Sequence, residues 1–224
     1  MTQHPIPGYE GPRATEATTA SPAVRYALWG VLVLVLASAF FAWALTWQTG
    51  AVAGPLPVGH AVPDFALTER SGKTVTKADL LGKVWIAGFV FTRCSGPCPT
   101  LSARMQRLQL HFKEEPDFKL VTFSLDPTVD TPAVLHDYAS RFHADADRWW
   151  FLTTDKESAM HDLVKTGFFQ TVIPARDGKE LIHSEYLVLI DRQGRIRGAY
   201  LGTDFENQPQ LIADVNKLLS ESGT

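Results

Sequence analysis

The longest apolar run of the chain covers residues 26–47, which contain no charged side chain. A helix over these residues spans about 33 Å at ~1.5 Å per residue, enough to cross the hydrocarbon core of a bilayer. Tyr26 and Trp29 lie near one end of the run, and Trp43 and Trp47 lie near the other. Aromatic residues concentrate at membrane interfaces in this way. We therefore predict one transmembrane helix over residues 24–47.

The segments on either side of this helix have no apolar period. Residues 1–23 are rich in Pro, Thr, Ala and Gly, which is typical of a disordered tail. Residues 48–59 form a predicted Gly/Pro linker, and residues 60–224 form the predicted folded domain. A cleaved signal peptide is an alternative, because residues 51–53 (AVA) resemble a cleavage site. The apolar run exceeds the ~7–15 residues of a signal peptide, which favours an uncleaved anchor.

Basic residues are distributed unequally around the apolar run. Arg13 and Arg25 precede it, whereas the first basic residue after it is Arg70. The positive-inside rule therefore predicts a cytoplasmic N-terminus and an extracytoplasmic domain. In such an oxidising compartment, two neighbouring cysteines tend to form a disulfide unless they are reduced or bound to a metal.

Beyond the linker, short apolar runs alternate with segments of helical periodicity. The run 84–91 is apolar on both faces, which is typical of a fully buried strand. A hairpin is expected across 65–76, and further strands are expected over 118–125, 149–152, 168–173, 186–190 and 195–201. Helices are expected over 99–113, from Thr131-Pro132 onward, over 156–166 and from about Pro209 onward.

This order of elements predicts an α/β domain in which a mixed sheet has helices on both faces. Ligand sites in such sheets lie beyond the carboxyl ends of the strands. Cys94 follows the carboxyl end of the strand 84–91, so it lies where the architecture favours a site. Lys and Arg number 21 against 24 Asp and Glu, and no basic stripe occurs. The charge distribution therefore argues against nucleic acid as a partner.

The chain has two cysteines, Cys94 and Cys98, separated by three residues. Gly96-Pro97 allows the loop between them to fold back, so that both sulfurs can face one point. Pro99 suits the first position of a helix, which makes Cys98 approximately its N-cap. The positive end of the helix dipole is then expected to lower the pKa of the Cys98 thiol. The motif alone permits either disulfide exchange or metal binding.

The spacing of the cysteines limits the kinds of site that they can form. A haem attachment motif is excluded, and a thioredoxin motif has one fewer intervening residue. Structural zinc requires four protein ligands, whereas Cu(I) accepts two thiolates and one imidazole. Of the seven histidines, His4 lies in the tail and His60 in the linker. Four others lie in or beside helices, where surface or capping roles are expected: His111, His136, His143 and His161. His183 lies in a polar turn before the strand 186–190, and an isolated histidine there is ordinarily a solvated loop residue.

Three motifs in this order resemble the Sco/SenC family of membrane-anchored copper chaperones with a thioredoxin-like fold. They are FTRCSGPCPT (91–100), SLDPTVDTP (124–132) and HS before YLVLID (183–184 and 186–191). The resemblance covers residues 58–219 and the N-terminal anchor. It implies a thioredoxin-like domain with a peroxiredoxin-like elaboration. It also implies that Cys94, Cys98 and His183 bind copper as Cu(I) or Cu(II).

The resemblance further implies delivery of copper to the binuclear copper centre in subunit II of cytochrome c oxidase. The expected partners are the apo copper domain of that subunit, other copper chaperones and a thiol reductant. The expected location is a bacterial-type inner membrane, with a single pass and the domain on the periplasmic side. Asp126 and Asp130 could contribute to the surroundings of the site, although a turn and a helix cap explain them more simply. A thiol–disulfide oxidoreductase is the alternative function, and a peroxidase has less support.

Overall fold

The computed structural model describes residues 21–48, 55–174 and 181–221. Residues 1–20 of the predicted disordered tail, residues 49–54 of the predicted linker and residues 175–180 before His183 therefore lie outside the described residues, as does the side chain of Trp47. The tail ends earlier than predicted, because Pro22 and Ala23 already belong to a helix. The chain separates into two compact units, residues 1–53 and 54–224. The domain boundaries given above stay a prediction.

The first unit contains the helix α1 (Pro22–Gln48). Within residues 22–43 an 18-residue window has a mean hydropathy of 2.0, so α1 is long and apolar enough to cross a membrane. All described side chains of this segment are exposed, whereas a helix in the core of a globular domain would be mostly buried. The expectation of an N-terminal apolar helix that could span a membrane is confirmed.

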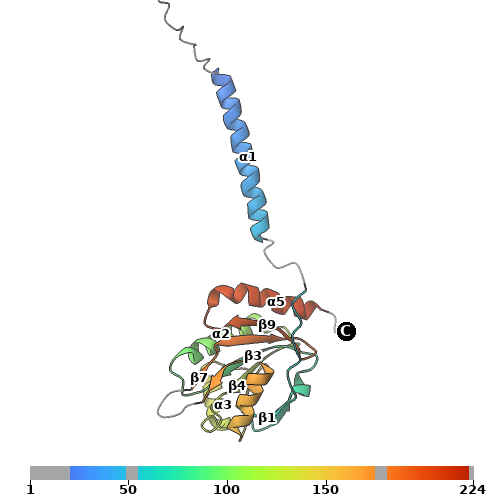
Figure 1. The fold of residues 1–224 in the computed structure, drawn as a ribbon, viewed down its shortest axis with the longest axis vertical. Helices are drawn as coiled ribbons and strands as arrows, with labels where there is room; N and C mark the ends of the chain where they lie inside the picture. The colour runs from blue at the N-terminus through green and yellow to red at the C-terminus, as the bar shows by residue number, and fades with distance from the viewer. Residues whose placement is uncertain (1–20, 49–54, 175–180, 222–224) are drawn as a thin grey trace, which may run out of the picture. The chain divides into compact units, whose positions relative to one another are not determined.

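The second unit is built on a seven-stranded mixed sheet with the strand order β2-β1-β5-β4-β3-β8-β9 (Figure 1). β3, β4 and β5 run parallel at its centre, and the remaining strands pair antiparallel. A separate two-stranded ribbon consists of β6 (Val172–Ile173) and β7 (Ile182–His183). The sheet strands are β1 (Ala66–Glu69), β2 (Thr74–Thr76), β3 (Val84–Val90), β4 (Phe118–Ser124), β5 (Trp149–Thr153), β8 (Tyr186–Ile190) and β9 (Ile196–Leu201).

The buried strand β3 shows how the sheet divides the core. Successive side chains of a strand point to opposite faces. Val84 and Ile86 therefore belong to one apolar cluster, while Trp85 and Phe89 belong to the other. The first cluster includes side chains of α2 (Pro97–His111), α3 (Pro132–Arg141) and α5 (Gln208–Ser220). The second includes side chains of α4 (Glu157–Asp162), so the expected helices on both faces of the sheet are confirmed.

Two predicted elements begin or end elsewhere in the structure. α2 begins at Pro97 with Gly96 as its N-cap, so Cys98 lies inside the first turn and not at the cap. Residues 163–167 continue α4 as a π-helical turn, and β6 covers only Val172–Ile173 of the expected strand 168–173. Phe168 is the C-cap of this turn, and the next residue, Phe169, has a positive φ of 53°.

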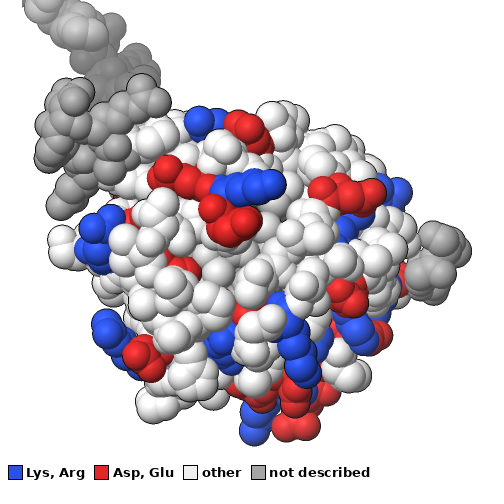
Figure 2. Space-filling model, turned by 90° about the horizontal axis from the view of Figure 1, so that it is seen from below, with Lys and Arg blue, Asp and Glu red and all other residues white. Residues whose placement is uncertain are grey.

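The described end of the predicted linker packs on the domain. Arg197, which is 4% exposed, donates from Nε to the Pro57 carbonyl and from Nη2 to the Leu56 carbonyl. The Gly59 N–H donates to the Ile196 carbonyl at 2.8 Å. On the face in Figure 2, Lys and Arg side chains lie beside Asp and Glu, with uncharged surface between them.

Candidate metal centre

Cys94 lies in the loop that connects β3 to α2, beyond the carboxyl end of the central buried strand. Its backbone N–H donates to the Phe91 carbonyl at 3.2 Å, which closes a tight turn at the end of the strand. The side chain is half-buried and packs against the apolar cluster below it. Cys94 is therefore accessible from solvent on one side only.

Cys98 is the second residue of α2 and is 0% exposed. Pro97 precedes it at the first helical position, where the missing N–H of proline removes no intrahelical hydrogen bond. The Cys98 carbonyl accepts a long 3.4 Å hydrogen bond from the Tyr138 hydroxyl, which also lies 2.8 Å from the Ser102 hydroxyl. This buried hydroxyl pair links the first turn of α2 to α3. Nothing in the sequence pattern distinguishes Tyr138 and Ser102 from ordinary helical residues, and sequence reasoning missed them.

His183 is held by the ribbon, where it pairs with Val172 across the two strands. The Ser184 N–H donates to the Thr171 carbonyl at 3.0 Å, and the Thr171 N–H donates to the Ser184 hydroxyl at 2.8 Å. These two bonds fix the residue that follows His183. The imidazole also contacts the Phe91 ring edge to face, with the ring centroids 5.7 Å apart.

The two nitrogens of His183 have different roles. Nδ1 lies 2.8 Å from the Ser184 carbonyl, which can only accept, so Nδ1 carries the proton. Nε2 then has a free lone pair, and it lies 3.4 Å from the Cys98 Sγ. A backbone carbonyl that accepts from one imidazole nitrogen orients the other toward a metal in many sites.

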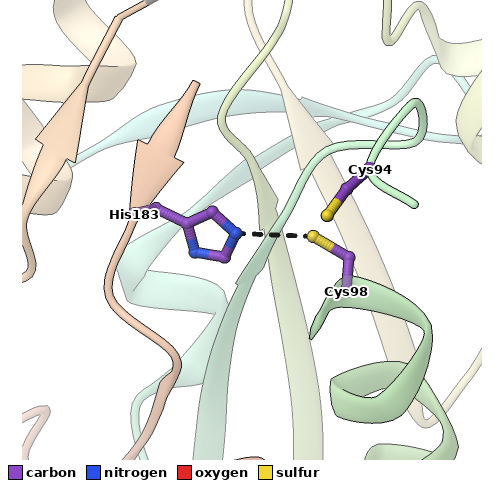
Figure 3. A group of neighbouring side chains, drawn as sticks. All are labelled: Cys94, Cys98 and His183. Atoms are coloured by element: carbon purple, nitrogen blue, oxygen red, sulfur yellow. Dashed lines mark hydrogen bonds between the residues drawn. The ribbon is translucent and has the colours of Figure 1, made fainter. Parts of the chain in front are cut away.

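Figure 3 shows the cluster, with His183 on one side and the two cysteine side chains on the other, all directed to a common centre. The Sγ atoms of Cys94 and Cys98 and the ligand nitrogen of His183 all lie within 4.8 Å of one another. Bonds of about 2.0–2.3 Å to a first-row ion place three ligand atoms roughly 3.5–4 Å apart. The three ligands predicted from the family resemblance are thus gathered with nearly the required spacing. Both cysteines are free thiols in this arrangement.

Burial shifts the pKa of two members of the cluster, Cys98 and His183. It raises the pKa of the Cys98 thiol, because the thiolate would lose its hydration. The expected lowering of this pKa is wrong, because desolvation of this fully buried sulfur is the largest contribution and it raises the pKa. Burial also lowers the pKa of His183, which favours the neutral imidazole that a metal requires.

Asp130, which is 0% exposed, ties the cysteine loop to the end of β4. Its carboxylate accepts from the Thr92 N–H at 3.1 Å, the Thr92 hydroxyl at 2.5 Å and the Ser124 hydroxyl at 2.6 Å. Burial raises the pKa of Asp130, while these hydrogen bonds oppose the shift. Asp130 therefore fixes Thr92, two residues before Cys94.

Asp126 holds the same loop from its exposed side. It accepts from the Arg93 guanidinium and, at 2.7 Å, from the Thr128 hydroxyl. The hydrogen bonds found for Asp126 and Asp130 among the described residues do not reach His183. Both carboxylates thus act on the cysteine loop; whether either contributes to a metal site stays a prediction.

The other described histidines lie apart from the cluster. His60, His111, His136 and His143 are exposed, as expected for surface residues. For His161 the expectation of a surface or capping role is wrong: it is 4% exposed, and its Nε2 bonds to the Leu125 carbonyl at 2.8 Å. Packing of α4 against the end of β4 buries this ring, which the helical pattern alone does not reveal.

The fold and the cluster together define a thioredoxin-like domain with two cysteines and one histidine at the carboxyl end of its central strands. The model of the SCO1/SenC family matches residues 55–220. The chain belongs to this family.

A curated relative, the SCO1 protein homolog of Bacillus subtilis, is 31% identical over 160 residues, which cover 71% of this chain and 83% of the relative. The solved structure of BsSco, described as a member of the Sco family of cytochrome c oxidase assembly proteins with a disulfide switch, is 28% identical. It has a TM-score of 0.67, and the match covers 75% of this chain and all of that one. Bradyrhizobium japonicum ScoI with copper bound is 25% identical, with a TM-score of 0.57, covering 71% of this chain and 99% of that one.

Proposed function

We propose that this chain binds one copper ion through Cys94, Cys98 and His183 and delivers it to the binuclear centre in subunit II of cytochrome c oxidase. The observation that carries the proposal is the convergence of two sulfurs and one imidazole nitrogen within 4.8 Å. Soft thiolate ligands select Cu(I), and imidazole suits both Cu(I) and Cu(II). Copper-bound ScoI, a structural relative of this chain, supports the choice of metal.

Copper binding at this site is coupled to proton release. The Cys98 thiol is protonated in the free protein because burial raises its pKa, and a thiol must lose its proton to bind a metal. His183 is already neutral, with its Nδ1 proton held by the Ser184 carbonyl. The copper therefore competes with a proton at sulfur and not at the imidazole.

The exposure of the three ligands suggests how copper leaves. Cys98 is fully buried, whereas Cys94 and His183 are half-buried, so an incoming thiolate reaches the copper from the side of Cys94 and His183. Replacement of ligands one at a time keeps the copper bound to sulfur throughout the transfer. The oxidase as the receiving protein follows from the Sco family of oxidase assembly proteins, to which BsSco belongs.

The membrane location belongs to the same proposal. Arg25 stands before the apolar segment of α1, and the domain follows it. The helix then crosses a bacterial-type inner membrane once, with the N-terminus in the cytoplasm and the domain on the periplasmic side.

A copper titration tests the proposal. The full-length chain, reduced and held in detergent, is titrated with Cu(I) against a competing chelator, and with Cu(II) by absorption. His183→Ala should weaken binding by at least about 100-fold, because even residues that only orient a ligand cost 10–100-fold. His136→Ala, on the exposed side of α3, is the control and should change nothing. Unchanged affinity and an unchanged Cu(II) spectrum in His183→Ala would exclude the three-ligand site.

A thiol–disulfide oxidoreductase is the second candidate, favoured by two free thiols close together. In that reaction a substrate disulfide gains two electrons and two protons, while Cys94 and Cys98 lose them and form a disulfide, which a thiol reductant must then reduce. Cys94 is the accessible sulfur and would attack first. Cys98→Ser should then trap a mixed disulfide with the substrate, and His183 should be dispensable. Absence of any adduct, together with full dependence on His183, would exclude this role.

A further inference from the structure

Five exposed apolar side chains lie on the ribbon that carries His183, on the segment before it and on the strand pair after it, and we call them the apolar rim. Its members are Phe169, Ile173, Ile182, Tyr186 and Leu201, which are 72%, 52%, 58%, 42% and 40% exposed. Single exposed apolar residues are normal on protein surfaces, whereas contiguous ones indicate an interaction site.

The strand register places them around His183. Ile173 and Ile182 are direct partners across the ribbon, and Ile182 precedes His183 in the chain. Tyr186 and Leu201 are direct partners across β8 and β9, and Tyr186 follows His183 by three residues. Side chains that are partners in an antiparallel pair lie on the same face, with Cβ atoms about 4.5–5.5 Å apart. Two exposed apolar pairs therefore lie on either side of the histidine along the chain.

The ribbon presents its two faces differently. Because side chains alternate along a strand, Val172 and His183 share one face and Ile173 and Ile182 share the other. Val172 is 3% exposed and lies on the inner face, whereas both isoleucines remain uncovered by the described residues. The outer face of the same short strand that carries His183 is thus apolar and exposed to solvent.

Phe169, the fifth member of the rim, has a strained backbone conformation. Its φ of 53° lies in the left-handed region, which is unfavourable for an aromatic residue by about 1–2 kcal/mol. The ring packs against His60, with centroids 4.3 Å apart, but remains mostly exposed. An open hollow beside it is lined by Lys165, Gln170, Thr171 and Val172. Strain that exposes an aromatic ring next to a recess is typical of a binding surface.

We infer that the apolar rim is the surface on which the copper-binding domain of subunit II docks, an inference that rests on the proposed function. A protein that exchanges ligands with the copper must place its own thiolates at the opening between Cys94 and His183. Its surrounding surface must then cover the strand that carries His183. The Arg93 guanidinium, next to Cys94 in the chain, is paired with Asp126, and the five side chains of the rim carry no charge, so the contact that the rim makes is mainly apolar.

The experiment uses the full-length chain in lipid nanodiscs, loaded with one equivalent of Cu(I), and the apo copper domain of subunit II. Two quantities are measured: the rate at which copper moves between the two proteins, and the affinity of the chain for the apo domain. The double variant Ile173→Thr, Ile182→Thr keeps β-branched residues in the ribbon and removes its apolar surface. Leu110→Gln is the matched control: Leu110 is 61% exposed on α2, and it lies twelve positions after Cys98, about 18 Å along the helix.

The double variant should bind Cu(I) within about twofold of wild type and transfer it roughly tenfold more slowly, the size expected when residues near the centre of an interface are lost. Phe169→Asn should also slow transfer while the domain becomes no less stable, because asparagine tolerates a positive φ. A purely structural role would instead couple slower transfer to lower stability. Leu110→Gln should transfer copper at the wild-type rate.

Several results would overturn the inference. One is wild-type transfer and affinity in the double variant, and another is an equal loss in Leu110→Gln. A change in self-association measured by sedimentation, or in vesicle binding, with transfer unaffected, would assign the rim to a second copy of the chain or to the lipid surface. If the wild type binds the apo domain through the rim but passes no copper, the proposed function fails and the docking surface stands. If it neither binds nor transfers, both fail.

Discussion

Asp130 provides the sharpest test of how the cysteine loop is held. In Asp130→Ala, three donors lose their acceptor: the Thr92 N–H, the Thr92 hydroxyl and the Ser124 hydroxyl. A hydrogen bond contributes a net ~0.5–1.5 kcal/mol, and a buried donor left unpaired costs ~1–3 kcal/mol. Asp130→Ala also removes a carboxylate whose burial raises its pKa, and the loss of this unfavourable desolvation offsets part of the destabilisation. We expect the free energy of unfolding to fall by about 2–4 kcal/mol.

The assay is urea unfolding of the copper-free chain in detergent, followed by near-ultraviolet circular dichroism. Asp130→Asn is the control, because it keeps one acceptor oxygen and the shape of the side chain. Its loss should be smaller than that of Asp130→Ala. A decrease below about 0.5 kcal/mol in Asp130→Ala, the level of ordinary surface substitutions, would refute the account of this cluster.

The pH dependence gives a second check on Asp130. Its pKa is raised in the folded protein, so the folded state binds the proton more tightly than the unfolded state. The resulting stabilisation is complete below the unfolded pKa of about 3.9 and is lost as the pH rises through the folded pKa. Wild type should therefore exceed Asp130→Asn in stability by more at acid pH than at neutral pH. The opposite trend would contradict the assigned direction of the shift.

Three further predictions follow from the core and the site. Leu187→Ala, at a 0% exposed position, should lower the free energy of unfolding by about 2–5 kcal/mol in the same urea assay, and a loss below 1 kcal/mol would contradict its place in the core. In Gly202→Ala the new Cβ would lie 2.7 Å from the Glu185 carbonyl oxygen and would overlap the Leu101 side chain. Such overpacking costs about 1–3 kcal/mol. The midpoint of thermal unfolding should therefore fall by several degrees. Because burial raises the pKa of Cys98, its thiol must lose a proton when Cu(I) binds. The apparent Cu(I) affinity, measured by chelator competition, should therefore fall by up to about tenfold per unit decrease in pH for each thiol proton displaced. An affinity independent of pH would contradict this coupling.

The sequence determined those features that depend on neighbours along the chain. The uncharged run at 26–47 predicted a helix that could span a membrane, since hydropathy and length suffice for that inference. The alternation of β and α segments predicted a mixed sheet with helices on both faces. The position of Cys94 after a doubly apolar strand predicted a site at the carboxyl end of the sheet. His183 was assigned through the resemblance of three motifs, because its spacing from Cys98 carries no signal.

The contacts between residues far apart in the sequence, and the depth of their burial, depend on how the elements pack together. The strand order β2-β1-β5-β4-β3-β8-β9 brings the ribbon with His183 to the cysteine loop. Burial reversed the expected shift of the Cys98 pKa and placed His161 and Asp130 in the interior. The register of the ribbon exposed Ile173 and Ile182 beside the site. The physical reason is the same in each case: propensity and periodicity act over a few residues, whereas desolvation and contact arise from packing between segments far apart in the sequence.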